Sequence, residues 1–557
     1  MSAPNAIAPL ADWLSLLALG LPLLLAGLLP WPGTRRWALA LAPGAALPAL
    51  ACALWGSEVV LQAPRLLLGL RLGLDGTGRS FLLLGALLWS IAGLAARAYH
   101  AEDAQRTRLW ACWLLAMAGN LWLVLARDAA GFYAGFALMT FAAYGLVVHA
   151  QTPQAWRAGR IYLLMSLLGE ALLLAGLIGR VAGLDGATDL PLAAPAGRHD
   201  GWALPLLIAG LGVKTGLPGL HLWLPLAHPV APTPASAVLS GVMIKAGLLG
   251  WLRFLPLGAQ ACPELGQALL LLGLLAAFGG VLAGLCQTQA KTVLAYSSIS
   301  QMGLMTVGLG AGLLQPAAWP ALGAALALYA LHHGLAKGAL FLAVAAVPAR
   351  GRGRRLALAL TGLPALALAG APLSSGALAK LLLKQPLALL PAAWPQWLGW
   401  LLPLAAAGTT VLMARFLWIL ARQSGQATPG MTGPWALALL ASALLAPLAG
   451  PLQLGWAFCW PVLLGLSLAA LAWRRPLPHP ALPAGDLLAW LEGPVARLWQ
   501  GLLALAARPD TPRPAAAPRP PWPWLRWEAR LQRFALALGL LVWLVLALWF
   551  SLGRPGR

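Results

Sequence analysis

The chain consists of long apolar runs separated by short polar gaps. Among the longest runs, which are rich in Leu and Ala, are 10–30, 80–96, 161–179, 263–285, 397–420 and 531–551. A helix of about 20 apolar residues spans the hydrocarbon core of a bilayer. The alternation of apolar and polar residues that is typical of a membrane β-barrel is absent. The pattern therefore predicts an all-α polytopic membrane protein with about 15–16 transmembrane helices.

These runs and gaps divide the chain into seven segments. They are 1–58 with two N-terminal spans, 59–78 as an extracytoplasmic hairpin, 79–385 as the central block of spans, 397–473 as three further spans, 485–507 as an amphipathic helix on the cytoplasmic face, 508–529 as a linker rich in Pro and Arg, and 530–552 as a final transmembrane helix. The hairpin is expected because short apolar runs flank Asp75-Gly76, a dipeptide that is typical of turns.

Charged residues are rare and strongly biased toward arginine. They make up 9% of the chain, against roughly 25% in soluble domains, and the formal net charge is +22. The arginines lie mainly in the gaps that follow odd-numbered spans. By the positive-inside rule those gaps face the cytoplasm, which places the N-terminus on the periplasmic side of a bacterial inner membrane. The charge therefore reflects membrane topology and gives no reason to expect nucleic acid as a partner.

The five cysteines lie far apart in the chain. No Cys-x-x-Cys pair occurs, and such pairs are typical of zinc sites, redox motifs and disulfide frameworks. We therefore expect neither a metal nor a cofactor in this chain. Redox chemistry of its own is not expected either.

Lysine is confined to one part of the sequence. Only six of the 37 basic residues are lysines, namely Lys214, Lys245, Lys291, Lys337, Lys380 and Lys384. Arg stays protonated, whereas a buried Lys can gain and release a proton near neutral pH. Placing a Lys at the bilayer centre costs about 2.5–3.5 kcal/mol, which argues for a function. Lys291 and Lys384 lie near span ends, where they can snorkel to the interface, so the other four are the candidates for proton transfer.

Acidic partners for these lysines are scarce. Of the fifteen carboxylates, only Glu170, in "YLLMSLLGEALLLAGL", lies centrally in a predicted span. Next to Lys214 it would hold that amine protonated, and a shift in its position would release the proton. The alternative is a structural ion pair that only anchors two helices.

A pair of histidines accompanies one of the lysines. In "LYALHHGLAKGALFL", His333 and Lys337 share one helix face, and His332 is adjacent. Histidine titrates in the range needed to pass protons. The run "KTVLAYSSISQMG" adds Ser298 and Gln301, which could line a hydrated path. Equally, these two could be hydrogen-bonded packing residues, which are common in membrane helices.

Prolines interrupt two of the predicted spans. Pro218 follows Lys214 by four residues in "GVKTGLPGLHLWLPLAH", and Pro372 lies in "GAPLSSGALAK". Broken helices at membrane depth are tolerated where they line a polar cavity, and they mark ion sites in transporters. His221 and His228 lie on the segment that leads from the first break toward the cytoplasmic side, so both are candidates to support the path.

Four stretches in this order resemble the antiporter-like subunits of respiratory complex I (subunits L, M and N), membrane-bound hydrogenases and Mrp cation/proton antiporters. They are "GVKTGLPGLHLWLPLAHPVAPTPASAVLSGVMIKAG", "KTVLAYSSISQMG", "HHGLAKGALFL" and "PLSSGALAK". The resemblance covers about 60–385 and implies two inverted five-helix repeats, each with a broken helix. It also implies that buried lysines, linked by water and histidine, pass protons across the bilayer. By position, the resemblance assigns Lys214 to the first broken helix, Lys245 to the following helix, Lys337 with His333 to the central relay, and Lys380 to the second broken helix.

Two positions depart from the family pattern. The family has a glutamate in the fifth helix where "GFALMTFAAYG" places Ala137. It often has an acid before the Ala-His of "WLPLAH", where this chain has Leu226. Glu170, one helix later than Ala137, is the candidate replacement for the missing glutamate.

The resemblance implies a lipid-embedded subunit that translocates H+ or Na+ and couples ion flow to partner proteins. The length and compact C-terminus resemble the membrane subunit of the DabA–DabB inorganic-carbon system, so our first hypothesis is CO2 or bicarbonate uptake with a DabA-like zinc protein related to carbonic anhydrase. The alternative is a proton-pumping subunit of a quinone-linked NADH dehydrogenase or a membrane-bound hydrogenase. A third hypothesis, suggested by Ala137, is a membrane anchor with a vestigial ion path.

Overall fold

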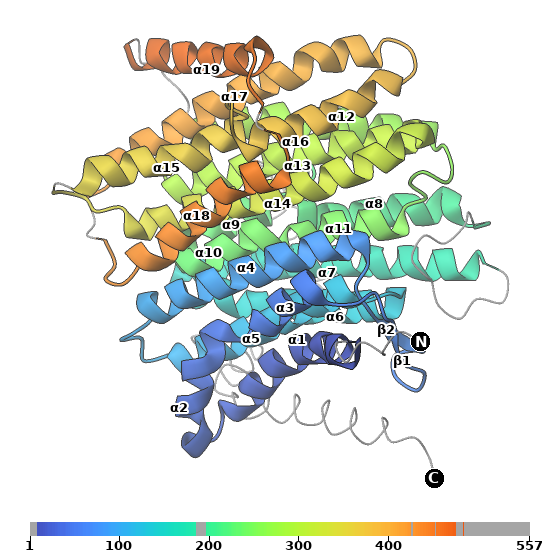
Figure 1. Cartoon of the computed structure of the whole chain (residues 1–557), viewed down its shortest axis with the longest axis vertical. Helices are drawn as coiled ribbons and strands as arrows, with labels where there is room; N and C mark the ends of the chain where they lie inside the picture. Colours follow the sequence, from blue (N-terminus) through green and yellow to red (C-terminus); the bar gives the residue numbers. More distant parts are fainter. Residues whose placement is uncertain are drawn as a thin grey trace, which may run out of the picture.

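The computed structural model describes residues 8–184, 197–351, 353–424, 427–451 and 453–474, together with Pro483. Figure 1 shows the described helices stacked along the long axis of the molecule, with the N-terminal helices at one end and α17 and α19 at the other. The predicted all-α polytopic fold is confirmed. The amphipathic helix predicted at 485–507, the linker at 508–529 and the last span at 530–552 lie outside the described residues.

The helices alternate with short connections. In chain order they are α1 (Ala8–Leu28), α2 (Pro32–Leu41), α3 (Leu47–Trp55), α4 (Gly76–Tyr99), α5 (Arg106–Leu125), α6 (Ala129–Val147), α7 (Pro153–Ala182), α8 (Asp200–Thr215), α9 (Trp223–Val230), α10 (Thr233–Val238), α11 (Lys245–Phe254), α12 (Pro263–Leu285), α13 (Ala290–Leu314), α14 (Trp319–Ala346), α15 (Gly353–Ala369), α16 (Ser375–Lys384), α17 (Trp394–Arg422), α18 (Thr432–Ala449) and α19 (Trp456–Arg474). A π-helical turn, Leu239–Met243, joins α10 to α11.

A small hairpin precedes α4. Strands β1 (Leu61–Ala63) and β2 (Leu70–Leu72) pair antiparallel. The segment that the sequence predicted as a hairpin therefore does contain one, but its turn spans residues 64–69 and not Asp75-Gly76. Asp75 instead caps α4, because its carboxylate accepts a hydrogen bond from the backbone N–H of Gly78.

Ten helices in the described part of the chain are long and apolar enough to cross a membrane, and two shorter apolar helices lie at 13–28 and 456–472. The sequence predicted about 15–16 spans, and three features account for the difference. The two predicted spans that prolines interrupt are each divided by a break, into α8 and α9 and into α15 and α16, so neither half is long enough alone. The polar residues of α13 lower its hydropathy, and the last predicted span is outside the described residues.

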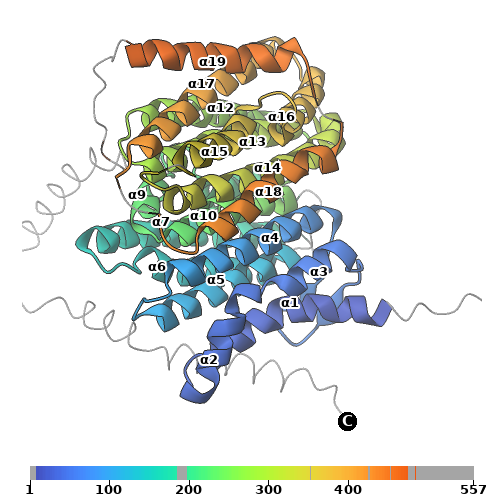
Figure 2. The same ribbon diagram turned by 60° about the vertical axis from the view of Figure 1, so that its left-hand side comes forward.

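Paired helices approach one another closely at glycines. A Cβ on Gly210 of α8 would lie 2.5 Å from the backbone nitrogen of Leu173 in α7, and one on Gly303 of α13 would lie 2.5 Å from the carbonyl oxygen of Gly273 in α12. Figure 2 shows α18 returning beside α4 and α14, so that the C-terminal helices also cover the centre of the chain. Such small-residue contacts bring backbones together where lipid supplies no hydrophobic drive.

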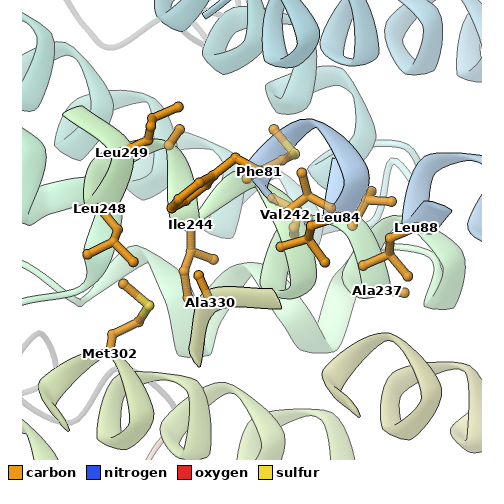
Figure 3. Packing of buried hydrophobic residues seen from close by; sticks show 14 of the residues in the cluster. Phe81, Leu84, Leu88, Ala237, Val242, Ile244, Leu248, Leu249, Met302 and Ala330 are labelled. Carbon is orange, nitrogen blue, oxygen red and sulfur yellow. The ribbon is translucent and has the colours of Figure 1, made fainter. Parts of the chain in front are cut away.

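The centre of the core lies between α4, the α10–α11 segment, α13 and α14. Figure 3 shows Phe81 and Leu84 of α4 packed near Val242 and Ile244, with Met302 and Ala330 approaching from α13 and α14. These apolar contacts surround the segment that precedes Lys245, a side chain that is only 1% exposed. The fold therefore places lysine side chains inside a closely packed apolar interior.

Candidate functional site

The first broken helix lies between α8 and α9. Gly216 ends α8 in the left-handed conformation, with φ of 82°, and Gly219 repeats that conformation. The indole Nε1 of Trp223, the first residue of α9, donates a hydrogen bond to the carbonyl oxygen of Val213 at 2.7 Å. Pro218 thus lies inside the predicted break. The indole of Trp223 donates to the Val213 carbonyl group, which the break leaves without a helical partner.

Lys214, in the last turn of α8, lies in a box of aromatic rings. Its Nζ is 5.4 Å from the ring centre of Phe136, 5.3 Å from that of Tyr162 and 5.6 Å from that of Trp223. It also donates a hydrogen bond to the Tyr162 hydroxyl at 3.4 Å. The side chain is 4% exposed. The ring faces favour a cation within about 6 Å, so the box stabilises the ammonium form.

Glu170 lies beside this box on α7. The close approach of α7 and α8 at Gly169 and Gly210 brings its carboxylate into electrostatic range of Lys214. The two side chains form no ion pair within 4.0 Å among the described residues. Ala137 on α6 is half-buried, while its neighbour Phe136 contacts the lysine. The predicted partners therefore share a site without direct contact, and the role of Glu170 as counter-charge stays a prediction.

A hydrogen-bonded series of groups joins Lys245 and Lys337 at the centre of the molecule. Lys245 Nζ donates to the carbonyl oxygen of Ser240 at 2.7 Å, and the hydroxyl groups of Ser240 and Ser298 lie 2.7 Å apart. Ser298 donates to the carbonyl oxygen of Leu294 at 3.0 Å, and Lys337 Nζ donates to the same oxygen at 2.6 Å. Both lysines are at most 1% exposed. The series therefore links two ammonium groups through backbone and hydroxyl oxygens, inside the protein.

The two histidines of α14 face different neighbours. His333 is completely buried, neither ring nitrogen has a hydrogen-bond partner among the described residues, and its electrostatic neighbours include Lys245 and Lys337. His332 instead places its Nδ1 2.8 Å from the hydroxyl of Ser375 at the start of α16. The sequence predicted both as part of one path. His333 therefore lies beside the series of Lys245, Ser240, Ser298 and Lys337, which we call the central series. His332 lies at the second broken helix.

The second broken helix lies between α15 and α16. Gly370, with φ of 87°, and Leu373, with φ of 62°, adopt left-handed conformations around Pro372. Lys380 on α16 donates to the last carbonyl groups of α15, at 2.9 Å to Leu368 and 2.7 Å to Ala369. The C-terminal end of a helix carries partial negative charge, so these carbonyls act as the counter-charge of the ammonium.

Two cavities lie beside basic side chains of the site, one at Lys380 and one at Lys291. Lys380 lines a cavity of about 140 Å³ together with Tyr329 and Gly370. A surface pocket of about 530 Å³ is lined by Lys291 and Arg422, among others. Each contains a basic side chain, and charged groups within membrane proteins face the bundle interior or a water-filled cavity.

Three candidate residues lie to the side of the central series. Gln301 accepts from the Tyr329 hydroxyl at 2.9 Å and donates to Thr409 at 3.0 Å, an arrangement that favours the packing interpretation. His221 is 8% exposed and lies edge-on to Tyr296. His228 is fully buried, stacks on Phe341, and has Lys337 and Lys291 as its electrostatic neighbours.

Several residues at the site were missed from the sequence. They are Phe136, Tyr162, Trp223, Ser240 and Ser375. Three signals were available, because Trp223 and Ser240 lie inside the quoted motif "GVKTGLPGLHLWLPLAHPVAPTPASAVLSGVMIKAG" and Ser375 lies inside "GAPLSSGALAK". Single aromatic residues on other helices carry no such signal, since only the fold shows that they face a lysine.

The fold and this row of lysines define a class, the polytopic helical membrane proteins with ionisable groups buried along their centre. Residues 126–385 match the family model described as NADH:quinone oxidoreductase/Mrp antiporter, transmembrane. The predicted relation to the antiporter-like subunits is confirmed.

Known proteins agree with this assignment. Hydrogenase-4 component B of Escherichia coli is 31% identical over 239 residues, which cover 41% of this chain and 35% of that protein. NADH-quinone oxidoreductase subunit N of Desulforudis audaxviator is 30% identical over 276 residues, covering 46% and 54%. A chain of the Mrp complex from Dietzia shares the fold, with a TM-score of 0.69 and 24% identity over 98% of this chain and 69% of that one. The chain thus spans about half or less of the length of these two curated relatives.

Proposed function

We propose that this chain is an ion-translocating subunit of a multi-subunit membrane complex, and that it moves protons, or Na+ as the second candidate, across the bilayer. The observation that carries the proposal is the buried series of Lys245, Ser240, Ser298 and Lys337, with His333 beside it. A cation at this depth costs several kcal/mol, and structural anchoring alone would be served by apolar residues.

Lysine suits this role for a chemical reason. The chain uses arginine for most of its cations, and arginine cannot release its proton. The buried lysines have carbonyl oxygens and hydroxyl groups as neighbours, which accept a proton in a hydrogen bond but do not fix the charge as a carboxylate would. An ammonium held in this way can lose its proton to a neighbouring imidazole or water.

The path that we propose runs between the two cavities. From the pocket at Lys291 it passes His228 to Lys337, and then His333, an electrostatic neighbour of both lysines, to Lys245. The carbonyl oxygens of the central series hold the two ammonium groups in place. His332 and Ser375 lead from Lys245 to Lys380 and its cavity.

Lys214 and Glu170 have a separate role in this proposal. They lie to one side of the central series, and Lys214 is enclosed by aromatic rings. A partner subunit that changed the distance between Lys214 and Glu170 would change the field at the central lysines. This pair is therefore the element that couples ion movement to the rest of the complex.

The named relatives bear on which complex this is. They belong to a hydrogenase, to an NADH-quinone oxidoreductase and to an Mrp complex. They support our alternative hypothesis, a proton-pumping subunit of such complexes, better than the inorganic-carbon hypothesis. Coupling to a DabA-like zinc protein stays a prediction that co-purification of the partner subunits would decide.

The experiment uses the native complex, purified through a tag on this chain. Mass spectrometry of the co-purified subunits identifies the class of complex. Membrane vesicles with a pH-sensitive dye then report proton movement for Lys214→Ala, Lys337→Ala and the control Arg160→Ala, whose side chain is exposed on α7. We expect both lysine variants to assemble but to lose proton movement, while the control keeps it. Normal proton movement in both lysine variants would overturn the proposal.

A further inference from the structure

A cluster of two histidines and an aspartate lies outside the site described above. His100 follows α4, Asp103 lies in the connection to α5, and His149 follows α6. His100 Nδ1 is 2.7 Å from Asp103 Oδ2, and His149 Nε2 is 2.6 Å from the same oxygen. One ligand atom from each of the three residues lies within 4.8 Å of the others. Two connections that are distant in sequence therefore meet at one carboxylate oxygen.

The cluster is built so that its donor atoms converge. Both imidazole rings are enclosed, with side chains 6% and 7% exposed, and they meet at 88° with centres 5.0 Å apart. Asp103 Oδ1 is held by the backbone N–H of Gln105 at 2.7 Å, which orients the carboxylate. The carboxylate is 24% exposed, which leaves one side of the cluster accessible. The outer nitrogens His100 Nε2 and His149 Nδ1 have no hydrogen-bond partner in the described part of the chain.

A charged neighbour also bears on ligation. Arg108 lies nearby and donates to the His149 carbonyl oxygen at 2.8 Å. Its positive charge opposes a cation, so the carboxylate has to offset it.

We propose that His100, Asp103 and His149 bind a divalent transition metal ion of the zinc class. Two imidazole nitrogens and one carboxylate oxygen are ligands that Zn²⁺ takes, and the exposed side leaves a fourth position for water. Bonds of about 2.0–2.1 Å to a tetrahedral ion would require the donor atoms to separate by several tenths of an ångström. Small side-chain rotations suffice for this. The absence of Cys-x-x-Cys predicted no metal, but this site uses no cysteine.

The bound ion would fasten the α4–α5 connection to the α6–α7 connection. α6 carries Phe136 of the aromatic box, and α7 carries Glu170. An ion here would therefore restrain the two helices that flank Lys214, from a position outside the spans. Because it adds bonds that exist only in the folded state, it would also stabilise the protein.

The test uses the full chain, purified in detergent and stripped of metal with a chelator. Zinc content after addition of Zn²⁺ and gel filtration is measured by mass spectrometry for wild type, His149→Ala, Asp103→Asn and the control His199→Ala, whose imidazole is exposed. Asp103→Asn keeps the shape of the cluster if His149→Ala fails to fold. We expect about one zinc per chain in wild type and in the control, a loss of at least about tenfold in affinity in the two cluster variants, and no retention of Mg²⁺.

The opposite results are equally clear. Absence of retained zinc in wild type, with a lower unfolding temperature for Asp103→Asn, would mean that the cluster is only a hydrogen-bonded contact between two connections. Zinc retained equally by all four proteins would mean that it binds elsewhere. Either result overturns the proposal.

Discussion

The two broken helices hold their lysines in different ways. At the first break, Lys214 is 4% exposed, is surrounded by three aromatic rings and has a carboxylate, Glu170, in electrostatic range. At the second break, Lys380 is only partly buried, donates to two carbonyl oxygens of α15 and faces a cavity of about 140 Å³. One lysine is enclosed by aromatic rings, and the other lines a cavity.

The difference indicates different tasks for the two positions. Aromatic rings and a carboxylate stabilise the charged form of Lys214 without offering it a proton acceptor that leads to solvent. In our proposal, the cavity beside Lys380 gives its ammonium group a route to exchange its proton with water. We infer that the first break senses charge and that the second exchanges protons with one side of the membrane.

The largest expected effect comes from Lys→Arg substitution at the two breaks. Lys380→Arg replaces the proposed proton-exchanging amine with a group that cannot release a proton, and we expect proton flux in vesicles to fall roughly 100-fold, the lower end of what a positioned proton-transfer group contributes. Lys214→Arg keeps a positive charge among the aromatic rings but places a larger group there, so a fall of about tenfold is expected. Equal losses at the two positions would remove the distinction between them.

A smaller effect is expected from Glu170→Gln, since the lysine keeps its aromatic box but loses its counter-charge. We expect proton flux to fall about threefold, which corresponds to about 0.7 kcal/mol. The double variant Glu170→Gln/Lys214→Arg should be no slower than Lys214→Arg alone. The control is Glu264→Gln, because Glu264 is exposed at the start of α12. A loss that adds fully to that of Lys214→Arg would show that the two residues act independently.

The smallest effects are expected from substitutions in the backbone of the breaks. They are measured as losses of protein stability by thermal unfolding in detergent. Gly216→Ala adds only the left-handed strain of about 1–2 kcal/mol, because the nearest atom to the new Cβ is 3.6 Å away. Gly376→Ala should cost about 3 kcal/mol or more, since the new Cβ would overlap the carbonyl oxygen of Ala367. A larger loss for Gly216→Ala would show that the first break is the more tightly packed of the two.

Much of the fold could be predicted from the sequence because apolar runs and prolines act locally. The apolar run at 263–285 is α12, which covers Pro263–Leu285. Both breaks lie around the prolines that predicted them, Pro218 and Pro372. Asp75 was the exception, because an aspartate before a glycine is typical both of a turn and of a helix N-cap, and only the neighbouring strands decide between these structures.

The site could be predicted as a set of residues but not as a set of contacts. Adjacent histidines differ by about 100° on a helix, so His332 and His333 reach different neighbours. The π-helical turn before Lys245 changes the rotation of α11, which no sequence period shows. Glu170 and Lys214 could be paired by elimination, but the aromatic rings that surround the lysine depend on how three helices pack.

The most direct test of the central claim is the initial rate of proton movement in vesicles that contain the assembled complex with Lys337→Ala. Lys337 is completely buried and shares the Leu294 carbonyl with Ser298, so the proposed path cannot pass this point without it. The account predicts that the variant complex assembles with the same subunits and shows no proton movement above background, while Arg160→Ala behaves as wild type. A fully assembled Lys337→Ala complex with the wild-type rate would contradict the claim.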